Sequence, residues 1–368
     1  MVNMYIKNLE LVNYKNIEQL TLELSSGINC FVGNNGVGKT NILDSIYYLS
    51  FCKSYFSLPD SQNLKHGADF MVIHGIYDKA GEEEDVFCGY KKGQKKKFKR
   101  NKDEYKRLSD HIGLLPSVMA TPSDNNIISG GNEERRKFMD SVISQWDHEY
   151  LNFLIRYNKS LLQRNKMLKS FVKDAELLEV LDEQLAYLGK FIHKKRSEFV
   201  ERIVPYFQKY YEAISLGKEK VSLGYKSQLN DNSFNELLKD SFHKDSVMQY
   251  TTVGIHRDNL DFKLDDYNAN KIASQGQKKT YLTAMKLAQF DFIKNVCGIK
   301  PILILDDIFD KLDAERVEQI VRLVSDNNFG QILISDTNKD HIDSILKNIA
   351  TDFKLFVIDN GGIVNEKR

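Results

Sequence analysis

The sequence predicts an α/β fold whose core is assembled from both ends of the chain, with a helical subdomain inserted between them. An apolar strand pattern at residues 28–32 runs into a glycine-rich turn and then into a helical pattern over residues 40–51. The end of the chain alternates strands with helices, which is typical of a mostly parallel sheet with right-handed crossovers. Between these parts, residues 133–204 contain no proline and a single glycine, which favours packed antiparallel helices.

The N-terminal part reads as a series of strands. Apolar and polar residues alternate over the first 24 residues, with turns expected at 13–16 and 25–27. After the helix of residues 40–51, strand patterns return from residue 71 to about residue 101. A hairpin centred on Gly93 is expected in that stretch.

The C-terminal part is expected to complete the α/β core. The strand and helix patterns found there are strands 221–225, 248–253 and 260–264, helix 276–295, strand 302–305, helix 314–325, strand 331–334, helix 340–349 and strand 354–358. We therefore predict three parts: an N-terminal lobe over residues 1–132, an inserted helical arm over 133–215, and a C-terminal lobe over 216–368.

Composition excludes several classes of protein. Of the 368 residues, 42% are hydrophobic and 28% are charged, an ordinary globular balance. No apolar run approaches the ~20 residues that span a bilayer, and MVNMYIKNLE lacks the pattern of a secretory signal, so we expect a cytoplasmic protein. The formal net charge is +1, so any nucleic-acid contact must come from a local patch. The cysteines are scattered and are expected to be buried thiols: Cys30, Cys52, Cys88 and Cys297.

A phosphate-binding loop follows the first buried strand. Residues 33–40 read GNNGVGKT, which fits G-x-x-x-x-G-K-[ST] between a predicted strand and a predicted helix. The glycines let backbone N–H groups turn toward phosphate oxygens, and the N-terminal end of the helix favours the same anion. Lys39 would place its charge on the β- and γ-phosphates, and Thr40 would offer its hydroxyl to Mg²⁺. A chance glycine turn is the weaker alternative.

An acidic pair ends a second buried strand. Residues 302–305 (ILIL) lead into Asp306 and Asp307, and ligands of open α/β sheets gather at the carboxyl ends of strands. We expect Asp306 to hold Mg²⁺ and Asp307 to orient the attacking water. The alternative is a solvated turn at the strand end. Asp310 and Asp313 would continue as a turn and a helix N-cap.

A second candidate anion site precedes the helix of residues 276–295. Ser274, Gln275, Gly276 and Gln277 would place a serine and exposed N–H groups at the helix start. Simple capping is the alternative. A chain with one phosphate loop and a separate anion-binding helix start predicts a dimer in which each copy grips the nucleotide bound by the other.

Several motifs together carry a resemblance to a known family. In order along the chain they are LVNYKNIEQLTLEL, GNNGVGKTNILDSIYYLS, TPSDNNIISGGNEERRKFMD, GIHRDNL, ASQGQKKT and ILILDD followed by FDKLD. They resemble the ATP-binding-cassette (ABC) ATPases of the chromosome-maintenance and DNA-repair branch, and more closely the RecF family of DNA replication and repair proteins, along nearly the whole chain. The resemblance implies an ABC-type P-loop ATPase head with an inserted helical subdomain.

The resemblance also implies functional roles. The chain would be a weak DNA-dependent ATPase that forms an ATP-dependent homodimer, binds DNA at gaps or single-strand/double-strand junctions, and works with RecO and RecR to load RecA. Asp310 to Asp313 would be the D-loop, Asp307 and Lys39 would be catalytic, and Thr40 and Asp306 would bind Mg²⁺. The ATP-binding set would comprise Gly33, Asn34, Asn35, Gly36, Val37, Gly38, Lys39, Thr40, Ser274, Gln275, Gly276 and Gln277.

Some positions depart from the family pattern and keep alternatives open. Residues 335–337 (SDT) stand where many cassette ATPases have a switch histidine, and no glutamine is obvious near Thr121. Asp307 replaces the commoner glutamate, which is compatible with slow turnover. The role of the motif at 254–258 (GIHRD) is not assigned by the sequence. The alternatives are the ATPase subunit of a membrane transporter and a nucleotide-gated scaffold that hydrolyses nothing.

One basic stretch is the candidate DNA contact. Residues 91–102 carry eight basic side chains in twelve positions, and on a hairpin they would form a concentrated positive tip. A merely solvated loop is the alternative. The expected contacts are Lys95, Lys96, Lys97, Lys99 and Arg100. A second candidate cluster lies at residues 135–137 (RRK), for which a role at the nucleotide or at the dimer interface is an equal alternative. No set of residues that would read bases is visible, so we expect any DNA contact to be with the backbone.

Overall fold

The computed structural model describes residues 1–56, 59–170, 174–309, 312, 314–325, 329–337, 342 and 352–367. They form two compact units. The head unit comprises Met1–Asp124, Tyr210–Gly217 and Gln275–Arg368, and the insert unit comprises Asn125–Lys209 and Lys218–Ser274. The core of the chain is therefore built from both of its ends, as the sequence predicts.

The division differs from the expected three parts mainly in residues 218–274, which we assigned to the C-terminal lobe. In the structure they belong to the insert unit. The reason is local pairing: β9 (Val221–Lys226) and β10 (Asn259–Leu264) pair antiparallel with each other, and β10 also packs against helix α3 (Asn132–Ile143).

The first sheet of the head unit is antiparallel, with strand order β2-β1-β4-β5-β6-β7. Its strands are β1 (Met4–Tyr14), β2 (Ile17–Glu23), β4 (Phe70–Lys79), β5 (Glu82–Lys91), β6 (Lys97–Arg100) and β7 (Asp103–Glu104). The predicted hairpin is present, because Cys88 on β5 pairs with Phe98 on β6. Gly93 in the turn has φ 78°, a value that favours glycine.

The second sheet of the head unit carries the predicted parallel core, with strand order β15-β14-β3-β13-β12-β8. The strands are β3 (Ile28–Val32), β8 (Ser117–Ala120), β12 (Ile302–Asp306), β13 (Ile332–Asp336), β14 (Phe353–Asp359) and β15 (Gly362–Lys367). All neighbouring pairs are parallel except β14 with β15. Strands β3, β12 and β13 are buried along their whole length, which explains why their sequences are mostly apolar.

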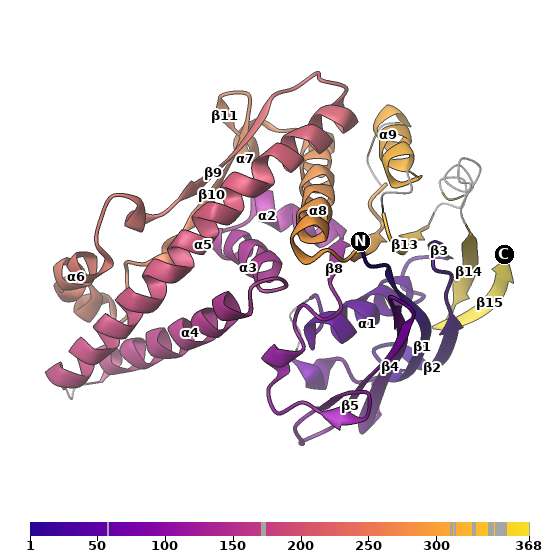
Figure 1. The fold of residues 1–368 in the computed structure, drawn as a ribbon, viewed down its shortest axis with the longest axis horizontal. Helices are drawn as coiled ribbons and strands as arrows, with labels where there is room; N and C mark the ends of the chain where they lie inside the picture. The colour runs from indigo at the N-terminus through magenta and orange to yellow at the C-terminus, as the bar shows by residue number, and fades with distance from the viewer. Residues whose placement is uncertain are drawn as a thin grey trace. The chain divides into compact units, whose positions relative to one another are not determined.

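Helix α1 (Lys39–Phe51) lies against strands of both sheets (Figure 1). Its apolar side chains join the two sheets into one hydrophobic core. The described part of the head unit also contains α8 (Gln275–Cys297) and α9 (Ala314–Ser325). The predicted bounds of α9 match those observed. The predicted helix at 340–349 lies outside the described residues apart from Ile342.

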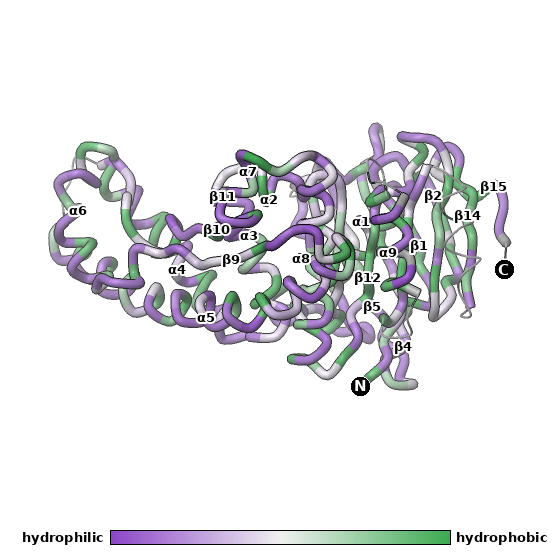
Figure 2. Tube along the Cα trace, turned by 90° about the horizontal axis from the view of Figure 1, so that it is seen from above, coloured by the Kyte–Doolittle hydropathy of each residue, from purple (hydrophilic) through white to green (hydrophobic). Residues whose placement is uncertain are grey.

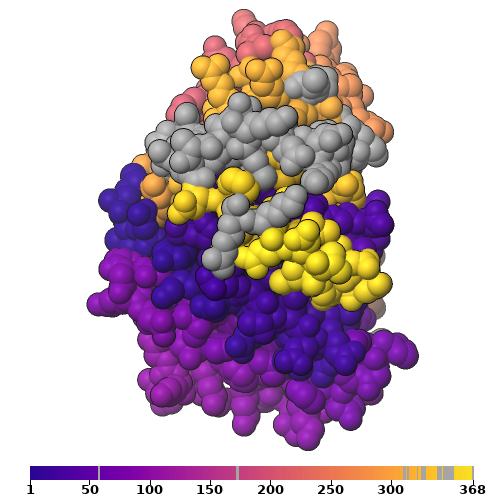
Figure 3. Space-filling model, turned by 90° about the vertical axis from the view of Figure 1, so that its right-hand side faces the viewer, coloured from indigo at the N-terminus to yellow at the C-terminus, as the bar shows by residue number. Residues whose placement is uncertain are grey.

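The two ends of the chain meet directly in the head unit. Figure 3 shows the yellow C-terminal strands beside the indigo N-terminal segment. Strand β3 lies between β14 and β13, and β15 contacts β2. The sheet that carries the phosphate loop is thus completed by the last residues of the chain.

The insert unit combines helices with one small sheet. Its long helices are α3, α4 (His148–Lys169) and α5 (Ala175–Ser215), and α5 continues into the head unit. Hydrophobic and hydrophilic residues alternate along α4 and α5 (Figure 2), as expected for helices with one buried face. The remaining elements are α2 (Asn125–Ser129), α6 (Phe234–Met248), α7 (Ala269–Ile272) and the sheet β11-β10-β9, in which β11 is Tyr267–Asn268.

One predicted strand is wrong. Residues 248–253 are expected to be extended, but α6 runs to Met248 and the chain then turns at Gln249, which has φ 59°. Thr251 and Thr252 make side-chain bonds instead of joining a strand ladder. The Thr252 hydroxyl donates to Asp245 at 2.7 Å, and the Thr251 backbone N–H donates to Asn165 at 2.8 Å. Such bonds compete with regular strand pairing.

The cysteines behave largely as predicted. All four are free thiols, and Cys30, Cys52 and Cys88 are buried while Cys297 is partly exposed. Burial raises the pKa of Cys30 and of Cys88 to about 12, so these thiols stay protonated at neutral pH. Within the described ranges, no helix is both long and apolar enough to cross a membrane.

Candidate functional site

The phosphate loop lies between β3 and α1, at the carboxyl edge of the parallel sheet. Gly38 directly precedes α1 with φ 117°, a conformation that L side chains rarely adopt. Gly33 lies so close to β14 that an added Cβ would stand 2.3 Å from the carbonyl oxygen of Ile358. These two positions therefore require glycine for the loop to close.

The Lys39 ammonium lies across the loop. Its Nζ donates to the carbonyl oxygens of Gly33 at 2.7 Å and of Asn34 at 2.9 Å, and only 4% of the residue is exposed. A phosphate oxygen is a stronger acceptor than a carbonyl oxygen because it is charged. The ammonium is thus held at the place where a phosphate in the loop would replace these acceptors.

Thr40 and Asp306 meet although 266 residues separate them in the sequence. The Thr40 hydroxyl donates to the Asp306 carboxylate and lies 3.0 Å from both of its oxygens. A hydroxyl beside a carboxylate fits Mg²⁺, which prefers oxygen ligands and is usually bound through one or two carboxylates, waters and substrate phosphates. The donor set predicted for the metal is therefore brought together.

Ser335 at the end of β13 connects the two acidic residues. Its hydroxyl donates to Asp306 Oδ1 at 2.5 Å, because Ser335 and Asp306 are paired across β13 and β12. The backbone N–H of Asp307 donates to both the carbonyl oxygen and the hydroxyl of Ser335, each at 3.2 Å. The sequence marks this position only as the place of a missing switch histidine. Its partners become visible only in the sheet register.

The two aspartates have different surroundings. Asp306 is 3% exposed, and burial raises its pKa to about 6 even though Ser335 and Thr40 donate to it. Asp307 is half-buried, with the left-handed backbone value φ 47°. The left-handed turn lifts Asp307 out of the strand that buries Asp306, so that water can reach its side chain.

Residues missed by the sequence analysis also support the loop. Asn16, in the turn between β1 and β2, donates to the Gly36 carbonyl oxygen at 3.3 Å and accepts from the side chain of Asn41 at 2.7 Å. The backbone N–H of Gly361 donates to the Val37 carbonyl oxygen at 2.8 Å. No local pattern announces these contacts, because they join segments far apart in the chain.

The second predicted anion site lies at the start of α8. Ser274 directly precedes the helix, and both Ser274 and Gln275 are exposed. The Thr280 hydroxyl donates to the Gly276 carbonyl oxygen at 3.0 Å and accepts from Arg316 of α9 at 2.6 Å, which ties α9 to the first turns of α8. In the predicted D-loop, Asp310, Lys311 and Asp313 lie outside the described residues.

The basic hairpin divides into exposed side chains and side chains engaged within the protein. Lys95 and Lys97 are exposed. The Lys96 ammonium, by contrast, lies 3.1 Å from Asp60 and 2.5 Å from the Cys52 carbonyl oxygen. Arg100 binds Glu84 in a two-bond pair, 2.7 and 2.5 Å, which holds the pKa of that carboxyl below its usual range. Two of the five predicted DNA contacts are therefore engaged within the protein.

The RRK cluster at 135–137 is likewise engaged. Buried Arg135 donates to the carbonyl oxygens of Ile127 and Leu260, at 3.0 and 2.9 Å. Arg136 donates to the Asp258 carbonyl oxygen at 2.9 Å, and Lys137 pairs with two glutamates of its own helix. Arg135 and Arg136 thus join separate segments of the insert unit, whereas the ion pairs of Lys137 stay within its own helix.

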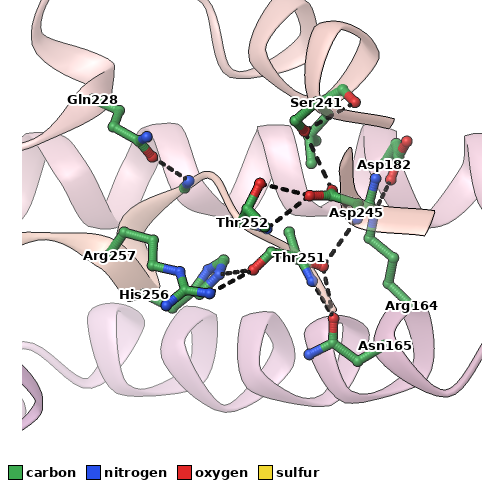
Figure 4. Close-up of polar contacts among 12 residues, drawn as sticks. Arg164, Asn165, Asp182, Gln228, Ser241, Asp245, Thr251, Thr252, His256 and Arg257 are labelled. Carbon is green, nitrogen blue, oxygen red and sulfur yellow. Dashed lines mark hydrogen bonds and ion pairs between the residues drawn. The ribbon is translucent and has the colours of Figure 1, made fainter. Parts of the chain in front are cut away.

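The motif at 254–258 contributes to a polar cluster of the insert unit, in which Asp258 is buried and Arg257 is exposed (Figure 4 shows His256 and Arg257). His256 Nδ1 contacts the Tyr157 hydroxyl at 2.8 Å and Nε2 contacts the Thr251 carbonyl oxygen at 3.0 Å. A carbonyl oxygen only accepts, so Nε2 carries the proton and the tyrosine donates to Nδ1. Burial lowers the pKa of His256 to about 4, which keeps the ring neutral. Arg257 Nη2 also donates to Thr251, at 3.1 Å.

Two arginines complete this cluster. Arg164 is fully buried and binds Asp182 and Asp245, each at 2.6 Å (Figure 4). Arg196 binds Asp258 at 2.8 Å, and the Tyr225 hydroxyl donates to the same carboxylate at 2.5 Å. The motif that the sequence left unassigned thus has a structural role.

Comparison with known proteins agrees with these features. The family model for the RecF/RecN/SMC N terminal domain matches residues 5–354. DNA replication and repair protein RecF of Phocaeicola vulgatus is 53% identical over 367 residues, which cover 99% of each chain. The same protein of Flavobacterium johnsoniae is 46% identical and covers 96% of this chain and 99% of its own.

Solved structures are similar as well. The recombination mediator protein RecF with ATP, of the RecFOR pathway, superposes with a TM-score of 0.89 at 29% identity, covering 100% of this chain and 98% of that one. The Smc head domain of Pyrococcus furiosus gives a TM-score of 0.59 at 17% identity over 98% of this chain and 95% of that one, a likeness of fold alone.

Proposed function

Because the chain belongs to the RecF family of DNA replication and repair proteins, we propose that it is an ATP-dependent recombination mediator that binds DNA at gaps and at single-strand/double-strand junctions. In this role it works with RecO and RecR to load RecA. Similarity over the full length of its relatives supports the proposal. Further support comes from the likeness to a solved RecF, which is a recombination mediator of the RecFOR pathway.

The observation that carries the proposal is the contact between Thr40 and Asp306 at 3.0 Å. It joins the phosphate loop to the acidic strand, two motifs from opposite ends of the chain. A phosphoryl-transfer site needs both at one point, because Thr40 of the first motif and Asp306 of the second would together hold a Mg²⁺ ion beside the phosphates. An accidental glycine turn would not have a buried carboxylate opposite its threonine.

In the proposed site, Lys39 binds the β- and γ-phosphates, and Thr40 and Asp306 hold Mg²⁺. The ion, when bound, offsets the charge that develops on the phosphate oxygens. Asp307, which is half-buried, orients the attacking water. Its carboxylate is one methylene shorter than the glutamate common in cassette ATPases, so we expect slow hydrolysis.

A second copy of the chain completes the pocket in this proposal. Ser274 and Gln275 are exposed at the start of a 23-residue helix, whose first N–H groups favour an anion. We propose that this segment grips the γ-phosphate bound by the partner, so that ATP closes the dimer and hydrolysis releases it.

For DNA, we propose the exposed lysines of the hairpin, Lys91, Lys92, Lys95 and Lys97, as the contact surface. Lys96 and Arg100 are left out because they form ion pairs within the head unit. Lys99, half-buried with its ammonium 6.0 Å from the ring centre of Phe87, is at most a minor contact. Binding through phosphates releases counterions, so affinity is expected to fall steeply with salt.

Fluorescence anisotropy with a gapped duplex tests the main proposal. ATP is expected to raise the affinity of the wild type for DNA on the order of tenfold, and Lys39→Ala should remove that effect. Asp307→Asn should keep ATP-dependent DNA binding while its phosphate release falls to background. DNA binding that is indifferent to ATP would contradict the proposal, and a wild type that releases no phosphate would reduce the chain to a scaffold.

The hairpin surface has its own test. Lys95→Glu with Lys97→Glu should weaken binding to gapped duplex about tenfold or more and flatten its dependence on salt. The matched control is Lys7→Glu with Lys65→Glu, the same change of charge on partly exposed lysines elsewhere in the head unit. Equal losses in both double variants would show that only net charge matters and would exclude the hairpin as the contact.

A further inference from the structure

A buried polar chain joins helix α1 to helix α8 within the head unit. It begins at Asp44 on α1, which is fully buried and pairs with Lys15 at 2.6 Å. The second oxygen of this carboxylate accepts the backbone N–H of Tyr55 at 2.7 Å. The Ser54 hydroxyl donates to Asp44 at 2.8 Å as well, so the segment that follows α1 is fixed to the helix.

The side chain of Tyr55 continues the chain of contacts toward α8. Its hydroxyl donates to Asp124 and accepts from the Lys286 ammonium at 3.0 Å. Lys286 also pairs with Asp124 at 3.1 Å, and the two side chains are only 5% and 6% exposed. The same ammonium lies 5.4 Å from the centre of the Tyr55 ring. Three groups from three segments therefore share one buried site.

Each of the three segments belongs to, or directly neighbours, an element that carries the proposed ATP site. Tyr55 is fixed to α1, which starts in the phosphate loop. Asp124 follows β8, the parallel neighbour of β12 that ends in Asp306. Lys286 lies on α8, eleven residues after Gln275, a distance of about 16 Å along a helix axis.

Burial makes this contact selective for one arrangement of the helices. A lysine and an aspartate lose their hydration here, and their attraction compensates only while the geometry is close. A shift of α8 along its axis by one residue would separate Lys286 from both partners. Apolar side chains at these positions would tolerate such a shift, because dispersion contacts have no direction.

We propose that Lys286 is a positioning residue that, through Asp124 and Tyr55, fixes the register of α8 against the phosphate-loop helix and so sets where the first turn of α8 presents its N–H groups. The inference rests on the proposed ATP-driven dimer, whose second half-site is that first turn. Lys286 itself touches no nucleotide in this account.

The test compares Lys286→Met and Asp124→Asn with Lys294→Met as the matched control. Lys294 lies on the same helix, and its ion pair with Asp291 stays within α8. We expect Lys286→Met and Asp124→Asn to raise the dissociation constant of the ATP-bound dimer at least tenfold in analytical ultracentrifugation. The affinity of the monomer for a fluorescent ATP analogue should change less than twofold. Lys294→Met should dimerise like the wild type.

Two further readouts separate positioning from a loss of fold. The ATP-bound dimer of the double variant should dissociate no more readily than that of the single variant with the larger loss, because both substitutions remove the same contact. Lys286→Arg, which keeps the charge, should recover at least half of the lost dimerisation free energy. If Lys286→Met does not fold, Tyr55→Phe tests the positioning role instead. Removing only the hydroxyl should raise the dissociation constant of the ATP-bound dimer at least threefold while ATP binding stays intact.

The outcomes are distinguishable from a failure of the proposed function. If the wild type does not dimerise with ATP, the proposed function itself fails. If the wild type dimerises and folded Lys286→Met dimerises equally well, only the positioning role is overturned. Loss of ATP binding in Lys286→Met would also overturn it, because the contact would then maintain the phosphate loop rather than the register of α8.

Discussion

Replacing Asp306 with asparagine is expected to stabilise the protein in the absence of metal while removing the carboxylate that the proposed Mg²⁺ site needs. Asp306 is buried at the end of β12, and burial raises its pKa to about 6. The hydrogen bonds from Ser335 and Thr40 lower the pKa, but the negative charge of Asp307 raises it again. Without metal, the ionised Asp306 carboxylate is therefore only partly compensated for its lost hydration.

The magnitude follows from the pKa. The unfolded chain has the ordinary aspartate value of about 3.9, so the folded state binds this proton more tightly by about two pKa units, or roughly 3 kcal/mol. A raised carboxyl pKa contributes stability below about pH 4 and loses it as the pH rises through about 6. Asparagine does not ionise. Asp306→Asn should therefore gain up to ~3 kcal/mol over the wild type near pH 8 and nothing near pH 4.

Urea unfolding in EDTA measures this difference across the pH range. The control is Asp307→Asn, the half-buried neighbour, for which we expect a change below about 1 kcal/mol. The reasoning is refuted if Asp306→Asn is no more stable than the wild type near pH 8, or if its advantage does not change with pH. The same variant should lose ATP hydrolysis, which would show that the site trades stability for function.

Other substitutions test the site and the insert unit. Lys39→Ala should weaken ATP binding on the order of 100-fold with unchanged circular dichroism, because it removes the only lysine of the loop; isothermal titration decides. Ser335→Ala should lower kcat about tenfold and leave ATP affinity within about twofold, since the lost bond orients Asp306 rather than the nucleotide; unchanged kcat would contradict this. Arg164→Met strands the buried Asp245 and should destabilise the insert unit by about 3 to 5 kcal/mol in urea, whereas a loss below about 1 kcal/mol would mean that water reaches that carboxylate.

Periodicity predicted the elements that have one strong local signal. Glycines between a buried strand and a helix indicate the phosphate loop. Apolar residues at helical spacing indicate α9. Residues 248–253 misled the prediction, because Thr251 and Thr252 resemble strand residues until their partners on α4 and α6 are known. A strand pattern reflects only the types of side chain along the sequence. In this segment, hydrogen bonds made by side chains determine the path of the backbone.

Site residues could be predicted only where a single local motif indicates their chemistry. Lys39, Thr40 and Asp306 follow from motif chemistry, and the structure joins Thr40 to Asp306. Ser335 and Lys286 have no such signal, because their partners lie 29 and more than 160 residues away in the chain. Contacts of this kind are set by strand order and helix register, which a single sequence does not encode locally.

The position of β3 between β14 and β13 has a consequence for biosynthesis. A ribosome synthesises β3 and the phosphate loop early. The two strands that flank β3, β13 and β14, are synthesised only near the end of translation. Until then both edges of β3 are unpaired, which exposes the nascent protein to misassembly during most of translation. Premature termination before residue 353 would remove β14 and leave one edge of β3, the strand that leads into the phosphate loop, without its parallel partner.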